Sequence, residues 1–199
     1  MANLLAVHSV GASLVTYLRN SYPDNLRQAH PCQFRLLSSG ELEETGVADT
    51  ALTLLLYRVT MNEHLRNTGR GPDLSNGFTP LALDLHYLLT VWANGALAEQ
   101  TILAWAMRQL YHHSVLDISS LSAEADWRPG DIVQVIPTDL TNDDIMRIWE
   151  ALEPRYRLSV PYVARVVRID PDDGPEFNRV VATRFSLANR AGVEEEVLP

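Results

Sequence analysis

The stretch that decides the fold is residues 80–92, PLALDLHYLLTVW. Apolar or aromatic side chains occupy every second position: Leu81, Leu83, Leu85, Tyr87, Leu89 and Val91. The positions between them are more mixed and include Asp84 and His86. Because successive side chains of a strand point to opposite faces, this alternation predicts a long β-strand with one buried face.

Further strands are predicted on both sides of this one. Residues 50–60, TALTLLLYRVT, are rich in leucine and β-branched residues, which predicts a strand buried on both faces near its middle. Residues 157–169 alternate as another long strand, but Pro161 lacks the N–H that a strand ladder needs. We therefore expect this strand at an edge of the sheet, or a bulge at Pro161. Shorter strands are predicted at residues 33–38, 132–136 and 177–185.

Three helices are predicted from apolar residues spaced three to four apart. They cover residues 3–20, 96–112 and 141–152. Thr141, followed three residues later by Asp144, forms a capping-box pattern at the start of the last helix.

The remaining stretches are predicted as turns and loops. They are a turn at residues 22–25, a polar, glutamate-containing loop at 39–49 and a long glycine-containing loop at 61–79. The prediction is one α+β domain over residues 1–190, with a mixed, mostly antiparallel sheet and about three helices. Residues 191–199 contain three consecutive glutamates and are expected to form an acidic flexible tail.

Composition argues against several classes of protein. The chain has 199 residues and a formal net charge of −9, and all 16 of its basic residues are arginine. A nucleic-acid binder needs a basic surface, so this balance argues against one. No stretch approaches the ~20 apolar residues that a membrane-spanning helix needs. The N-terminus lacks the basic start of a signal peptide and Cys32 is the only cysteine. We therefore expect a protein made in the reducing cytoplasm.

The residues that would suggest catalysis each have a simpler interpretation. Asp84 and His86 share a strand face, which suits an acid–base or metal pair, but also an Asp–His hydrogen bond or a subunit contact. Cys32 has His30 nearby, but two residues so close in sequence rarely reach the geometry that a nucleophile and its base need. Adjacent His112 and His113 point about 100° apart on a helix and suit its C-terminal end better than a metal. We therefore expect no enzyme, no metal and no cofactor.

Several stretches, taken in order, resemble one known family. They are residues 54–67 (LLLYRVTMNEHLRN), 80–92, 102–110 (ILAWAMRQL), 148–152 (IWEAL) and 156–167 (YRLSVPYVARVV). Their order and spacing resemble the cap, or tail-terminator, proteins of extracellular contractile injection systems, which include antifeeding-prophage and virulence-cassette particles. The resemblance spans most of the chain, from the first helix to about residue 169.

The resemblance implies a phage tail-terminator-like fold and a structural role. Such a cap is expected to form a homo-oligomeric ring, a hexamer, that ends the polymerisation of tube and sheath. The expected partners are other copies of the chain, the inner tube protein and the sheath protein, with no nucleic acid and no membrane. Two alternatives remain open: a tail-completion or baseplate adaptor protein, and a small hydrolase or metal enzyme that uses Asp84, His86 or Cys32.

The same stretches supply the predicted interface residues. These are Tyr57, Asn62, Leu65, Arg66, Asn67, Asp84, His86, Trp92, Tyr156, Arg157, Tyr162 and Arg165. An exposed edge of the strand at 157–169 is expected to exchange a strand with a sheath subunit. The loop at 61–79 and the acidic tail are expected to become ordered on contact with a partner.

Overall fold

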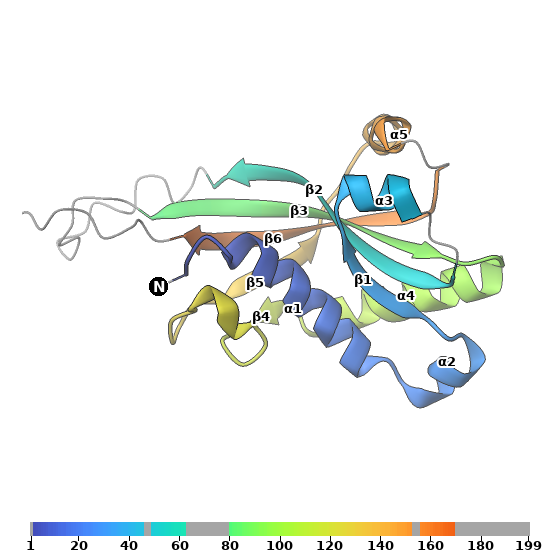
Figure 1. The fold of residues 1–199 in the computed structure, drawn as a ribbon, viewed down its shortest axis with the longest axis horizontal. Helices are drawn as coiled ribbons and strands as arrows, with labels where there is room; N and C mark the ends of the chain where they lie inside the picture. Colours follow the sequence, from blue (N-terminus) through green and yellow to red (C-terminus); the bar gives the residue numbers. More distant parts are fainter. Residues whose placement is uncertain (1, 46–48, 63–79, 153–155, 170–199) are drawn as a thin grey trace, which may run out of the picture.

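The computed structural model describes residues 2–45, 49–62, 80–152 and 156–169 (Figure 1). Within these ranges the helices are α1 (Ala6–Ser21), α2 (Asp24–Ala29), α3 (Ser39–Thr45), α4 (Ala96–His112) and α5 (Asn142–Ala151), with a 3₁₀ turn, η1 (Ala123–Ala125). The strands are β1 (Gln33–Leu37), β2 (Ala51–Met61), β3 (Leu81–Trp92), β4 (Val115–Leu116), β5 (Val133–Pro137) and β6 (Ser159–Ile169). The predicted strand at 177–185, most of the predicted loop at 61–79 and the boundary at residue 190 lie outside the described residues.

The described strands form one sheet in the order β1-β2-β3-β6-β5-β4. β1 runs parallel to β2, and every other neighbouring pair is antiparallel. The prediction of a mixed, mostly antiparallel sheet is therefore confirmed. Figure 1 shows the ends of β2, β3 and β6 reaching to the left, away from α4 and α5.

Helices cover both faces of the sheet. α1 and α4 lie on one face, the lower in Figure 1, and α3 and α5 lie on the other. The alternation predicted for β3 is confirmed from its third residue onward, where the core-facing side chains are all buried: Leu83, Leu85, Tyr87, Leu89 and Val91. Leu81, at the start of the strand, is 42% exposed. β2 is buried on both faces over Ala51–Leu55, which is its first half and not its middle.

Two short helices stand where loops and turns are predicted. α3 replaces the first part of the predicted loop at 39–49, and α2 begins inside the predicted turn at 22–25. The Ser38 N–H donates to the Glu41 carboxylate at 2.8 Å, and the Glu41 N–H donates to Ser38 Oγ at 3.4 Å. This reciprocal pair is a capping box, so the Ser-x-x-Glu pattern was a helix-start signal that the polar composition concealed. The α+β class stands, with these helices added to the predicted three.

The prediction that residues 157–169 form an edge strand, or a strand with a bulge at Pro161, is wrong in both parts, because the pairing with β3 is regular at Pro161. β6 lies inside the sheet, between β3 and β5, and the described edge strands are β1 and β4. Pro161 is tolerated because β5 stops beside it: the last β5 pair joins Pro137 to Tyr162. The Pro161 carbonyl still accepts from the Thr138 N–H at 3.0 Å. In an antiparallel strand the N and the carbonyl of one residue face the same side, so the missing N–H falls where the neighbouring strand has ended.

Candidate interaction surface

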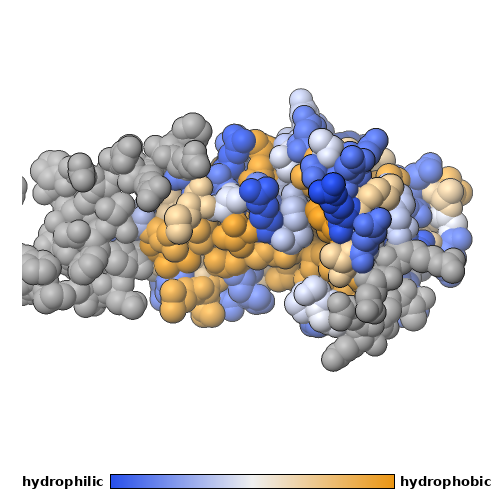
Figure 2. Space-filling view, turned by 90° about the horizontal axis from the view of Figure 1, so that it is seen from above, coloured by the Kyte–Doolittle hydropathy of each residue, from blue (hydrophilic) through white to orange (hydrophobic). Residues whose placement is uncertain are grey.

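The half of the sheet near Met61 and Leu81 has one face that α3 and α5 do not cover (Figures 1 and 2). We call this the open face. Its position follows from the pairing of Arg58 with His86 and of Thr60 with Asp84, opposite to the buried Leu85 and its neighbours. The open face consists of Tyr57, Arg58, Thr60, Asp84, His86 and Arg165. Figure 2 shows hydrophobic side chains on this side of the molecule interrupted by hydrophilic ones.

Two irregularities in strand pairing shape the open face. The β2–β3 register shifts between Leu56 and Arg58, and the β3–β6 register shifts between Leu83 and Leu85. Bulges of this kind bend a strand and re-aim its side chains. They let side chains from adjacent positions project together on the open face.

Asp84 holds the second irregularity in place. Val166 has a φ of 64°, a left-handed conformation that is an outlier for a β-branched residue. Its N–H donates to Asp84 Oδ1 at 3.1 Å, and Asn62 Nδ2 donates to both carboxylate oxygens at 3.0 and 3.1 Å. Asp84 and Asn62, two predicted interface residues, are therefore brought together as a structural pair beneath the surface.

His86 lies between two arginines on the open face. Its Nε2 is 3.0 Å from Thr60 Oγ1, and its ring makes an edge contact with Tyr57 at 6.1 Å between centroids. Partial burial and the positive charges of Arg58 and Arg165 lower the pKa of His86, while the Asp84 carboxylate acts in the opposite direction. With its pKa lowered, His86 is mostly neutral near pH 7, and the charges of the open face are those of Arg58, Arg165 and the Asp84 carboxylate.

The remaining predicted interface residues lie at the other end of the sheet or outside the described residues. Trp92 is buried and donates to Thr53 Oγ1 at 2.9 Å, with the Arg157 guanidinium 5.5 Å above its ring. Tyr162 is buried in the core at 3% exposure, so neither aromatic is available at the subunit surface. Tyr156 is 47% exposed. Leu65, Arg66 and Asn67 lie outside the described residues.

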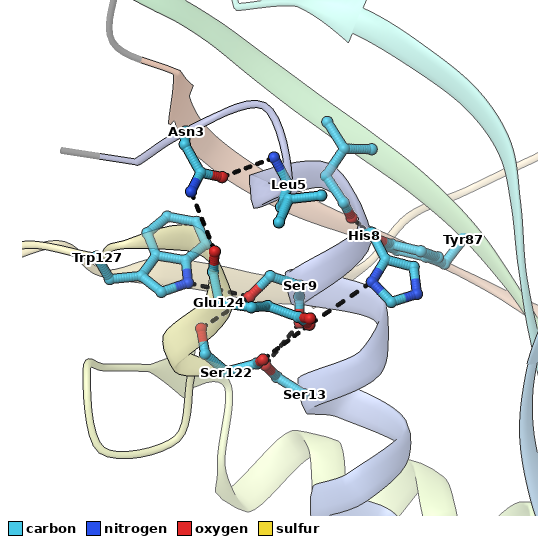
Figure 3. Close-up of polar contacts among 10 residues, drawn as sticks. Asn3, Leu5, His8, Ser9, Ser13, Tyr87, Ser122, Glu124 and Trp127 are labelled. Atoms are coloured by element: carbon cyan, nitrogen blue, oxygen red, sulfur yellow. Dashed lines mark hydrogen bonds and ion pairs between the residues drawn. The ribbon is translucent and has the colours of Figure 1, made fainter.

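The opposite side of the molecule carries a loop at residues 117–131, which we call the acidic loop. A seam of hydrogen bonds joins it to α1 (Figure 3). Trp127 Nε1 donates to Ser9 Oγ at 3.0 Å, and Ser9 Oγ donates to the Ser122 carbonyl at 3.1 Å. The Ser122 N–H donates to Ser13 Oγ at 2.8 Å. Ser9 and Ser13 are buried, which sequence reasoning missed; their one-turn spacing on the apolar stripe of the helix was the available signal.

The acidic loop holds four carboxylates and one arginine, Arg128. Asp117, Glu124 and Asp126 are exposed, and Asp131 is half-buried. Hydrogen bonds from the Ser119 hydroxyl and the backbone of Ser119 and Ser120 lower the pKa of Asp117. A second contact fixes the loop to the helix, because Asn3 Nδ2 donates to the Glu124 carbonyl at 3.0 Å.

Three residues considered for catalysis, Cys32, His112 and His113, lie in surroundings that do not activate them for chemistry. Burial raises the pKa of Cys32 to about 11, so its thiol is protonated and weakly nucleophilic near pH 7. His112 ends α4 and His113 is its C-cap, as predicted. In the described part of the chain, no three potential His, Cys, Asp or Glu ligands gather as a metal site would require. Among the described helices, none has the length and apolar character to cross a membrane.

Solved structures share this fold, and two of them are the following. One is the sheath/tube terminator of PVC, an extracellular contractile injection system, in the extended state: the TM-score is 0.59 and the identity 19%, over 94% of this chain and 64% of that chain. The other is the tube-terminating cap of the anti-feeding prophage: the TM-score is 0.55 and the identity 18%, over 89% of this chain and 60% of that chain. The chain thus spans less than two thirds of either protein, and at these identities the likeness concerns the fold.

No curated protein matches the sequence significantly. The family described as the Pvc16 N-terminal domain, in contrast, matches residues 9–183. This match covers most of the sequence and agrees with the resemblance that the strand and helix motifs carry. The chain therefore belongs to the Pvc16 N-terminal domain family.

Proposed function

We propose that this protein is a structural cap that ends the polymerisation of tube and sheath in a contractile injection particle. The observation that carries the proposal is the family match over residues 9–183, together with a fold shared with a sheath/tube terminator and a tube-terminating cap. The proposed partners are the inner tube protein, the sheath protein and further copies of the chain in a hexameric ring. The chain is made in the cytoplasm and carried on the assembled particle.

The physical logic of a cap concerns surfaces. A helical tube grows because each subunit presents a head-to-tail surface to the next. A closed ring that matches this surface on one side and offers none on the other stops growth. Two residues that could have served catalysis have structural explanations in the described part of the chain. The Asp84 carboxylate accepts from Asn62 and from the Val166 backbone, and burial keeps the Cys32 thiol protonated. The proposed role therefore involves no catalysis.

The test is to assemble particles in cells that lack this chain. Without the cap, electron microscopy is expected to show tubes and sheaths of unbounded, variable length with frayed ends, and re-supply of the wild-type chain is expected to restore bounded particles. Particles of normal length with intact ends in its absence would overturn the proposal. Labelling the chain on intact particles distinguishes the distal cap from a baseplate adaptor, which would lie at the opposite end.

A further inference from the structure

We propose that copies of this chain join head to tail, with the open face of one copy docked on the acidic loop of the next. This inference rests on the proposed function and names the surfaces that close the ring. Arg58 and Arg165 of one copy would face Glu124 and Asp126 of its neighbour.

Glu124 and Asp126 of the acidic loop lie beside Asn3, at the start of the segment that leads into α1, and not on the face that carries Arg58 and Arg165. The acidic loop is bonded to α1, which covers the lower face of the sheet in Figure 1. Arg58 pairs with His86 on the other face, and Arg165 follows the buried core residue Ala164. A ring of identical subunits needs two different, complementary surfaces on each copy, and surfaces on opposite sides allow every copy to use both.

The charges of the two surfaces are complementary. The acidic loop has four carboxylates against one arginine, in a chain whose net charge is −9. The exposed arginines Arg58 and Arg165 lie on the open face, and its carboxylate, Asp84, is half-buried and engaged with Val166. At the border of this face, the negative charge of Asp144 on α5 reaches Tyr57. Because the chain is acidic as a whole, an average surface of another copy would repel the acidic loop, whereas the arginines of the open face attract it.

Side chains of the kind found in interface centres accompany these charges. Tyr57 and His86 form an aromatic pair between the arginines of the open face, and tyrosine and arginine are enriched where proteins bind each other. On the other surface, Ile118 is 48% exposed beside Asp117, and Val115 is 50% exposed on the edge strand β4. The apolar groups would be covered at the centre of the contact, with the charged groups around them.

The acidic loop is already rigid enough to dock. Ser9 and Ser13 fix Ser122 and Trp127, and Asn3 fixes the backbone at Glu124 and the carboxylate of Asp126. A preorganised surface loses little conformational entropy when it binds. The occupant we assign to the open face is therefore a second copy of this chain, since both halves of the contact lie on the same molecule.

Paired charge reversals test the contact in the full chain. The first variant, Arg58→Glu with Arg165→Glu, makes both surfaces acidic. The second, Ala123→Lys with Glu124→Lys, makes the loop basic at two exposed positions of η1. A control variant, Arg27→Glu with Arg108→Glu, applies the same change of net charge as the first variant, but on α2 and α4.

Sedimentation velocity and native mass spectrometry report association. The wild type and the control are expected to form rings, and each test variant alone to associate at least about tenfold more weakly. In the first variant two acidic surfaces would meet, and in the second the loop would lose its net negative charge and place two lysines against the arginines. An equimolar mixture of the two test variants is expected to assemble again, with alternating copies, and added salt to weaken all assemblies.

Several outcomes would overturn the inference: no self-association of the wild type, a test variant that associates as well as the wild type, or a mixture that stays dissociated. Binding of the open face to an acidic surface of the tube or sheath protein instead would appear as loss of particle capping by the first variant with self-association unchanged. The proposed function fails by a different observation, normal particle ends without the chain, so the two failures are distinguishable.

Discussion

The backbone N–H of Val166 donates to Oδ1 of Asp84 across the β3–β6 pair at 3.1 Å. This bond fixes a valine at a φ of 64° in an interior strand. Left-handed backbone costs a β-branched residue about 1–3 kcal/mol and persists only when its surroundings enforce it. Asp84 is itself held by Asn62, so the three residues determine how the strands continue towards the open face.

Replacing Asp84 by alanine is expected to destabilise the fold. The change removes the acceptor of two N–H donors, and hydrogen bonds to a charged group contribute about 1.5–3 kcal/mol. Urea unfolding followed by circular dichroism measures the loss. Asp139→Ala, at an exposed carboxylate, is the control and is expected to change stability by less than about 0.5 kcal/mol. A loss no larger than the control's would show that Asp84 does not hold the bulge.

Val166→Gly tests the strain at the same place. Glycine adopts a positive φ without a Cβ penalty but loses more chain entropy on folding, about 0.5–1 kcal/mol. Relief of the left-handed strain offsets this cost, so the variant is expected to be as stable as the wild type or more stable by about 1 kcal/mol. Thermal unfolding checks the sign. A clear loss of stability would mean that the half-buried valine side chain matters more than its backbone conformation.

The seam between α1 and the acidic loop gives a third prediction. Ser9→Ala leaves the Trp127 indole N–H and the Ser122 carbonyl without their present partner, and each unsatisfied buried group costs about 1–3 kcal/mol. The variant is therefore expected to be destabilised and to show faster amide exchange in the acidic loop. In a double-mutant cycle, Trp127→Phe is expected to cost less in the Ser9→Ala background. Strictly additive losses would argue that the two side chains are not coupled.

The elements with strong periodicity could be predicted from the sequence. α4 has the predicted limits, and Thr141 caps α5 as its pattern indicates, accepting from the Asp144 N–H at 3.2 Å. β3 is predictable because one face is buried along almost its whole length. In these segments the local pattern and the tertiary burial agree, so the local signal is sufficient.

The missed features depend on contacts between segments far apart in sequence. β6 is an interior strand because β3 and β5 flank it. Pro161 indicates only that one N–H of the strand is missing, and not whether another strand lies beside it. The role of Asp84 depends on Val166, 82 residues away, and that of Ser9 on Trp127, 118 residues away. Asp84 and His86 do share a face as predicted, yet each binds a different partner. The alternation of a strand predicts which face a side chain lies on, but not which residue it will bind.

Cys32 reactivity tests the protonation of the only thiol. Burial raises its pKa to about 11 from 9.0, so the thiolate fraction near pH 7 is small. Alkylation of the native protein by iodoacetamide is expected to be slow near neutral pH and to accelerate up to about pH 11, whereas the urea-unfolded chain reacts faster at the same pH. Rapid native alkylation at pH 7 would contradict a half-buried, protonated thiol and reopen a nucleophilic role.

His86 titration reports the electrostatics of the open face. Its pKa is expected below the ordinary value of 6.5, first because of desolvation and then because of Arg58 and Arg165. Arg58→Ala removes a positive charge and should raise the pKa of His86, whereas Asp84→Ala removes the opposing carboxylate and should lower it further. NMR titration of the histidine ring signals measures both directions, with Arg108→Ala on α4 as the control.

The same pKa carries a consequence for stability. Because the unfolded chain binds this proton more tightly than the native one, the contribution of His86 to stability is complete above about pH 6.5 and decreases as the pH falls towards the native pKa. His86→Gln, which has no charge to gain, is therefore expected to lose less stability than the wild type between pH 7 and pH 5 in urea unfolding. A larger loss in the variant would contradict a lowered pKa of His86 in the native protein. Equal shifts of the His86 pKa in Arg58→Ala and in the control would show that Arg58 does not lower it.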